Sequence, residues 1–123
     1  MTSRIPLLVL ASALSLGLAG EAEAHAHLKS ATPAMGATVA KAPAELDLGF
    51  SEGVNPKFTG VKVTGPAGAV APTGESKLGP GGDTTLVVPV TGTLAAGTYK
   101  VDWHALATDG HKTNGTYTFT IKP

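Results

Sequence analysis

The stretch LAAGTYKVDWHA, residues 94–105, is the part of the sequence that decides the fold. From Tyr99 to Ala105, apolar and polar side chains alternate, which is the period of a strand with one buried face. The turn at Gly97, two residues before Tyr99, is typical of the tyrosine corner of Greek-key sandwiches, in which the tyrosine hydroxyl bonds back to a nearby backbone carbonyl. This stretch therefore predicts a strand at the corner of a β-sandwich.

The same period of two recurs in other short runs of the chain. The runs are 46–51, 61–63, the compact apolar stretch 86–88, 98–106 and 115–121. Turns rich in Gly, Pro and Asp separate them, and no window of useful length has the period of a helix. The last two runs are predicted to pair as a hairpin joined by 107–114. The sequence thus predicts an all-β domain, an immunoglobulin-like Greek-key β-sandwich or barrel of about seven strands.

The composition limits the classes of function. A chain of 123 residues that is 42% hydrophobic suits one small folded domain. Nine Lys and Arg residues balance nine Asp and Glu residues, so we expect no nucleic acid or anionic membrane as a partner. The absence of cysteine excludes disulfides, zinc fingers and thiol nucleophiles. The sequence has no nucleophile elbow, no phosphate-binding glycine loop and no H-E-x-x-H motif, so we expect no enzyme.

The first 24 residues have the order of a secretion signal. Arg4 gives a positive start, and the apolar run 5–18 is shorter than the roughly 20 residues that a spanning helix needs. The triplet AEA at 22–24 matches a cleavage site. We therefore expect residues 1–24 to be a signal peptide and residues 25–123 to be a periplasmic domain that is not itself embedded in a membrane.

Cleavage there makes His25 the first residue, and an N-terminal histidine is a distinctive metal ligand. Its α-amine and its imidazole Nδ1 can bind one ion together and close a six-membered chelate ring. Nitrogen-rich tetragonal sites suit Cu(II) best among the divalent metals. His111 would supply a third nitrogen and Asp109 an oxygen, with Gly110 giving the backbone the freedom to bring them together. Asp-Gly is also a frequent hairpin turn, so these residues alone leave an ordinary turn as the alternative.

Several motifs occur in order along residues 25–123. They are HAHL at 25–28, SATPAMG at 30–36, LGFSE at 48–52, GTYKVDW at 97–103 and TDGH at 108–111, which leads to GTYTF at 115–119. In these motifs the chain resembles the periplasmic copper-resistance protein CopC and its relatives. The resemblance implies a Greek-key barrel that holds Cu(II) in a histidine brace. The implied ligands are the amine and ring of His25, Asp109 and His111, and the implied acid near the copper is Glu52.

The chain departs from part of this family in its methionines. Some relatives add a Cu(I) site built from a methionine-rich loop, whereas this chain has only Met35 once Met1 is lost with the signal. Thioether ligands select Cu(I), so we expect the Cu(II)-only type. The resemblance also implies a carrier or buffer in copper resistance, with an inner-membrane copper-transport protein as the partner to test.

His27 supports a different geometry for the copper. A free amine followed by histidine at the third position can bind Cu(II) locally through two deprotonated backbone amides, and His25-Ala26-His27 fits that pattern. We expect those amides to be engaged in the ladder of the first strand, which makes His27 a neighbour or an auxiliary ligand. Of the remaining candidates, His104 is predicted to be an exposed surface residue and Trp103 a core residue.

Two other functions are compatible with these residues. Polysaccharide monooxygenases also use an N-terminal histidine brace, so a copper oxidase is the alternative to a copper carrier. Such an enzyme needs an open coordination position and a broad aromatic face, and this chain has only six aromatic residues, most of them on predicted core positions. The other alternative is a structural sandwich that binds no metal.

Overall fold

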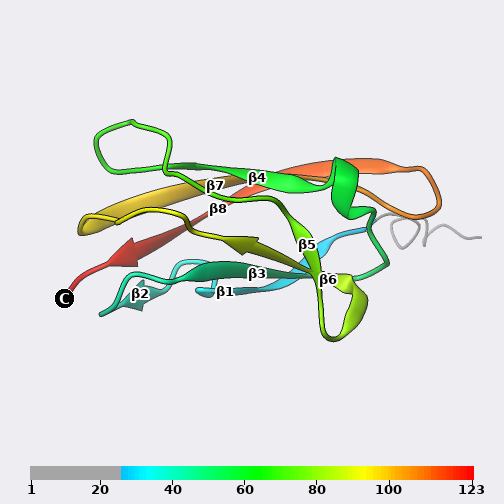
Figure 1. The fold of residues 1–123 in the computed structure, drawn as a ribbon, viewed down its shortest axis with the longest axis horizontal. Helices are drawn as coiled ribbons and strands as arrows, with labels where there is room; N and C mark the ends of the chain where they lie inside the picture. Colours follow the sequence, from blue (N-terminus) through cyan, green and yellow to red (C-terminus); the bar gives the residue numbers. More distant parts are fainter. Residues whose placement is uncertain (1–25) are drawn as a thin grey trace, which may run out of the picture.

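A computed structural model describes residues 26–123, and the predicted signal peptide and His25 lie outside the described residues. The described chain forms two stacked sheets (Figure 1). The first contains, in spatial order, β1 (Leu28–Thr32), β3 (Glu45–Phe50), β6 (Gly82–Pro89) and β5 (Lys77–Gly79). The second contains β2 (Thr38–Val39), β8 (Lys112–Ile121), β7 (Gly97–Leu106) and β4 (Gly60–Thr64). The predicted all-β sandwich is confirmed, with eight strands in the described residues rather than about seven.

The strands pair antiparallel, except that β2 lies parallel to β8. The predicted hairpin of the last two strands is confirmed, with a continuous register from Gly97 opposite Ile121 to Leu106 opposite Lys112. The second strand begins at Lys112 rather than at 115, so the connection is the short turn 107–111. The strand could not be extended to Lys112 from the sequence, because the hydrogen bonds of the ladder are made by the backbone and need no apolar side chains.

The core lies between the two sheets and is made by the inward-facing residues of the alternating runs. Fully buried members with large side chains are Phe119, Leu46, Leu48, Leu86, Val54, Val63, Val88 and Val101. Two aromatic pairs lie in this core, one between the two sheets and one between neighbouring strands of the second sheet. Phe50 meets Trp103 edge to face at 5.5 Å between ring centroids, and Tyr99 stacks on Phe119 at 5.4 Å. Burial of these rings supplies much of the stability of a domain without disulfides.

The predicted tyrosine corner and both predictions for the neighbouring residues are confirmed. The Tyr99 hydroxyl donates a 2.7 Å hydrogen bond to the Ala95 carbonyl. Trp103 is buried and His104 is exposed. The indole of Trp103 lies directly over Gly115, where a Cβ would come within 2.7 Å of the ring. Glycine is required at this position because the ring occupies the space of a side chain.

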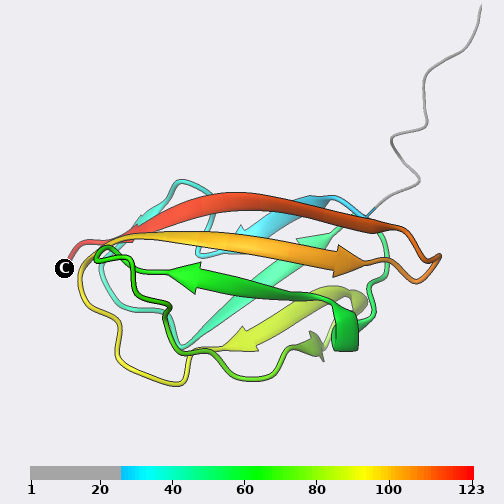
Figure 2. The same ribbon diagram turned by 90° about the horizontal axis from the view of Figure 1, so that it is seen from above.

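One end of the sandwich brings together segments that are far apart in the sequence. Figure 2 shows the β7–β8 turn, the start of the described chain and the short helix η2 (Pro56–Phe58) at this end, with the C-terminus at the other. We call it the loop end and define it by Ala26, residues 51–54 and the turn 107–111. The bridge between Val54 and Ala107 joins the last two of these segments.

Candidate metal centre

The turn 107–111 holds Asp109 and His111 against each other. Gly110 has a positive φ of 95°, and its amide donates to the Ala107 carbonyl at 2.9 Å. This tight turn lets Asp109 Oδ1 accept a 3.1 Å bond from the His111 amide, while Asp109 Oδ2 lies 3.1 Å from His111 Nδ1. The two side chains are in contact, and their binding to one metal ion stays a prediction. The turn thus holds a carboxylate oxygen and an imidazole nitrogen side by side, and both are atom types that can bind a metal ion.

Ala26 is fixed beside this turn. Its side chain is 0% exposed, and its carbonyl accepts a 2.8 Å hydrogen bond from the Thr113 hydroxyl. Thr113 lies two positions after His111 at the start of β8. The first described residue of the chain is therefore anchored next to the candidate ligands of the turn. Sequence reasoning missed Thr113, because a threonine in a predicted loop gives no signal of such a contact.

His27 is held by Ser51 through a pair of hydrogen bonds. The His27 amide donates to the Ser51 hydroxyl at 2.8 Å, and the Ser51 amide donates to the His27 carbonyl at 2.8 Å. We expected this amide in the strand ladder, but β1 begins at Leu28 and the acceptor is a side chain instead. The His27 amide therefore donates a hydrogen bond, as expected, although to a different acceptor. The role of Ser51 was also missed, although it lies within the LGFSE motif.

Glu52 lies on the segment that borders the turn. It is partly buried, and it directly precedes Gly53, whose carbonyl accepts a 2.9 Å bond from the Thr108 amide. This backbone contact puts Glu52 and Asp109 on neighbouring segments of the loop end. His104, in contrast, lies on the outer face of β7 opposite Asn114, apart from Asp109 and His111. Within residues 26–123, no three side chains of His, Asp or Glu gather as a metal site.

Two groups among residues 26–123 have clearly shifted pKa values, and neither is a candidate ligand. Burial raises the pKa of the Tyr117 hydroxyl to about 12, and this hydroxyl has no hydrogen-bond partner within the described residues. A hydrogen bond and the negative charge of Asp47 raise the pKa of the exposed Glu45 carboxyl. Tyr117 is therefore a neutral core residue at physiological pH, and it holds no ionised oxygen for a metal.

We expect Thr113→Val to loosen the first described residue from the turn. The variant loses the bond to the Ala26 carbonyl, so the free energy of unfolding should fall by about 1 kcal/mol. Urea denaturation followed by tryptophan fluorescence measures this change. Thr118→Val is the matched control, because Thr118 is an exposed residue of the same strand, and its effect should stay within about 0.5 kcal/mol. Equal losses in the two variants would contradict an anchoring role for Thr113.

The fold and the loop end define a small β-sandwich protein with a candidate metal site at one end. The family model of the CopC domain matches residues 28–122, and the chain belongs to the CopC family of copper resistance proteins. Members of this family are copper-binding, non-enzymatic and typically periplasmic. The expectation that the protein is not an enzyme is thereby confirmed. Residues 26–123 contain no helix with the length and hydropathy needed to cross a membrane.

Three relatives illustrate the similarity. Protein YobA of Escherichia coli K12 is 46% identical over 99 residues, which is 80% of this chain and 80% of that protein. The crystal structure of CopC from Methylosinus trichosporium OB3b superimposes with a TM-score of 0.73 at 29% identity, covering 80% of this chain and 95% of that one. PcoC, a methionine-rich copper resistance protein from Escherichia coli, gives a TM-score of 0.70 at 36% identity, covering 80% and 99%.

Proposed function

We propose that this CopC-family protein is a periplasmic Cu(II) carrier or buffer in copper resistance and homeostasis. Copper is held in a histidine brace formed by the amine and ring of His25, the ring of His111 and a carboxylate oxygen of Asp109. The observation that carries the proposal is the hydrogen bond from Thr113 to the Ala26 carbonyl, because it anchors the chain next to the turn that bears His111.

Covalent geometry supports the reach of His25. Successive Cα atoms of a chain are about 3.8 Å apart, so the residue before Ala26 starts close to this anchor. Thr113 and His111 are neighbours on β8 and its turn. If the signal is cleaved after Ala24, the new α-amine belongs to the residue that is joined directly to Ala26, which lies at the loop end. The proposal therefore depends on cleavage at that bond.

The geometry of the turn supports Asp109 and His111 as neighbouring ligands. The distance from Asp109 Oδ2 to His111 Nδ1 is 3.1 Å. Two donor atoms bound to one ion at about 2.0–2.1 Å and at right angles lie about 2.9 Å apart. An ion could be accepted between these two side chains after a small adjustment. Two nitrogens from His25, one from His111 and one oxygen make the tetragonal donor set that suits Cu(II).

The contacts of His27 argue against the local amino-terminal alternative. That geometry requires the His27 amide to lose its proton and bind copper, yet this amide donates to Ser51. Local binding would break this bond and disturb the reciprocal bond from the Ser51 amide to the His27 carbonyl. The brace leaves both intact. In our proposal, His27 and Glu52 are auxiliary groups near the copper.

The methionine content supports a Cu(II)-only protein. Met35 is the only methionine in residues 26–123, and it is 47% exposed in the connection between β1 and β2. A single thioether cannot supply the several sulfur ligands of a Cu(I) site. The copper oxidase alternative is not favoured, because five of the six aromatic side chains are buried and Phe58 alone is exposed. A broad aromatic face for a polymer is not formed by the described residues.

A copper titration of the processed protein tests the proposal. Protein that begins at His25 should bind one equivalent of Cu(II) with a tetragonal, nitrogen-rich EPR spectrum, and its affinity should fall below about pH 6 as protons compete for the amine and imidazoles. Cu(I) should bind weakly. An affinity that is flat between pH 7 and pH 5 would indicate an oxygen-dominated site, and tight Cu(I) binding would contradict the Cu(II)-only assignment.

A further inference from the structure

A cleft lies on the outer face of the second sheet, beside the loop end. Its volume is about 420 Å³. The side chains that matter for its chemistry are Lys57 and Phe58 of η2, His104 and Leu106 of β7, and Lys112 and Asn114 of β8. The brace does not use this cleft. Lys112 and Leu106 nevertheless flank the turn that carries the candidate copper ligands, so an occupant would stand next to the metal.

Phe58 gives the cleft an aromatic side chain that the fold holds out in solvent. It is 59% exposed, whereas the other aromatic residues of the chain are buried. The helix η2 fixes its position, because Asn55 Oδ1 accepts from the Lys57 amide at 2.9 Å and the Asn55 carbonyl accepts from the Phe58 amide at 3.1 Å. An exposed aromatic side chain lowers its free energy when a partner covers it, and such residues often anchor interfaces.

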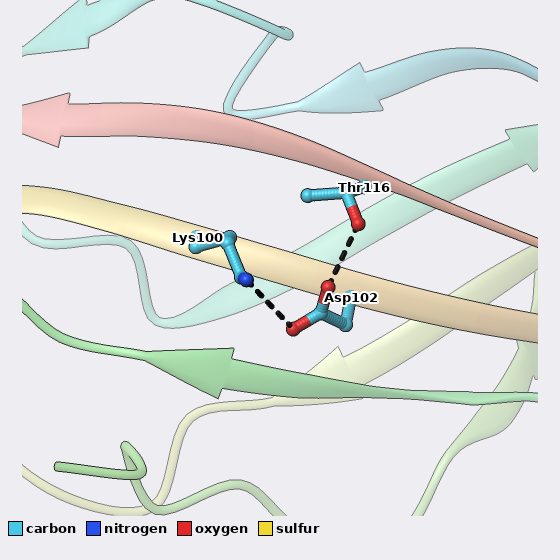
Figure 3. A network of polar contacts seen from close by, with 3 residues as sticks. All are labelled: Lys100, Asp102 and Thr116. Atoms are coloured by element: carbon cyan, nitrogen blue, oxygen red, sulfur yellow. Dashed lines mark hydrogen bonds and ion pairs between the residues drawn. The ribbon is translucent and has the colours of Figure 1, made fainter. Parts of the chain in front are cut away.

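The charge of the cleft has one sign. Two lysines and a histidine line it, and none of its lining residues is acidic. Asp102 lies on the same outer face two positions before His104, and it has polar partners of its own outside the cleft. It pairs with Lys100 at 3.9 Å and accepts a 2.7 Å bond from the Thr116 hydroxyl (Figure 3). The cleft therefore has a positive field, which favours acidic groups on whatever enters it.

We propose that this cleft is the docking surface for a partner protein that exchanges copper with the loop end, and that it receives an acidic segment carrying one apolar side chain. Carboxylates meet Lys57 and Lys112, and the apolar side chain covers Phe58. The exchange rests on the proposed function, whereas the docking does not. A concave cleft with a single aromatic side chain fits a peptide segment better than the plane of a membrane surface.

An NMR titration tests the docking without copper. The probe is a blocked pentapeptide of four glutamates around one leucine, added to labelled protein that begins at His25. Amide shifts should change at η2, at the end of β7 and at the start of β8. The double variant Lys57→Gln/Lys112→Gln and the single variant Phe58→Ala should each weaken binding about fivefold or more.

The matched control is Lys41→Gln/Lys122→Gln, which removes the same charge from exposed lysines near β2 and the C-terminus, away from the cleft. It should leave peptide binding within about twofold, since these charges lie beyond a Debye length. Equal losses in the two double variants would overturn the proposal. The proposal would also be overturned if the peptide changed amide shifts only in other parts of the domain, or if the shifts grew with protein concentration alone. Binding to anionic phospholipid vesicles without binding to the peptide would overturn it too. A Cu(II) titration of Phe58→Ala separates the two proposals, because the brace predicts unchanged affinity.

Discussion

His111→Ala is expected to weaken Cu(II) binding by at least about 100-fold, since loss of a ligand should cost at least as much as loss of the groups that orient ligands. In the brace, His111 closes the equatorial plane from a turn that is remote in sequence from the amino terminus. Its removal leaves the site with one nitrogen fewer. The measurement is a competition titration against a chelator of known affinity, accompanied by EPR, whose spectrum should change.

His27→Ala is the control that separates the two geometries. In the brace it should lower affinity much less than His111→Ala, because His27 is at most an auxiliary group and its backbone bonds to Ser51 do not need the side chain. In the local amino-terminal site the ranking is reversed, with His27 indispensable and His111 irrelevant. A damaging His27→Ala together with a harmless His111→Ala would exclude the brace.

One extra residue ahead of His25 is also expected to weaken Cu(II) binding by at least about 100-fold, because it moves the α-amine out of the chelate ring. The domain should remain folded, since the anchored residue is Ala26. Intact mass of periplasmic protein should first show that the natural chain begins at His25. An extra residue after Pro123 is the matched control, and it should leave the affinity unchanged.

Thermal unfolding provides an independent test on two proteins, the one that begins at His25 and the one with an extra residue ahead of His25. A ligand that binds only the folded state stabilises it by about 2.7 kcal/mol at a free concentration one hundred times the dissociation constant. The brace joins the start of the chain to the turn 107–111, so copper should raise the melting temperature of the protein that begins at His25 but not of the extended form. A local site would also bind the unfolded chain, and copper would then have little effect on either.

The strands with a clear period of two were predictable, and the short or polar parts of the fold were not. Alternation predicted the cores of β3, β4, β7 and β8, because inward and outward side chains differ there in polarity. Two-residue β2 and three-residue β5 are too short to show a period. The start of β8 at Lys112 is polar, and its pairing with Leu106 follows from the backbone ladder.

The candidate site was predictable only where side-chain chemistry is visible in the sequence. Asp109 and His111 were candidates because of their types and the glycine between them, although these residues alone left an ordinary turn as the alternative. The groups that position the start of the chain, Ser51 and Thr113, act through single hydroxyls on backbone atoms. Such contacts depend on the three-dimensional approach of distant segments, and hydroxyl residues are common in any exposed strand or turn.

The contact between Thr113 and Ala26 spans 87 residues of the chain, nearly all of the described domain. Contacts of such long sequence separation are slow to form, because the entropy of closing a large loop is lost before the contact returns any energy. If the chain is exported amino terminus first, as the proposed signal peptide implies, Ala26 leaves the membrane before Thr113 does. If copper is held in the proposed brace, the site is complete only after the last hairpin has docked, and we then expect partly folded chains to bind copper more weakly than the folded domain.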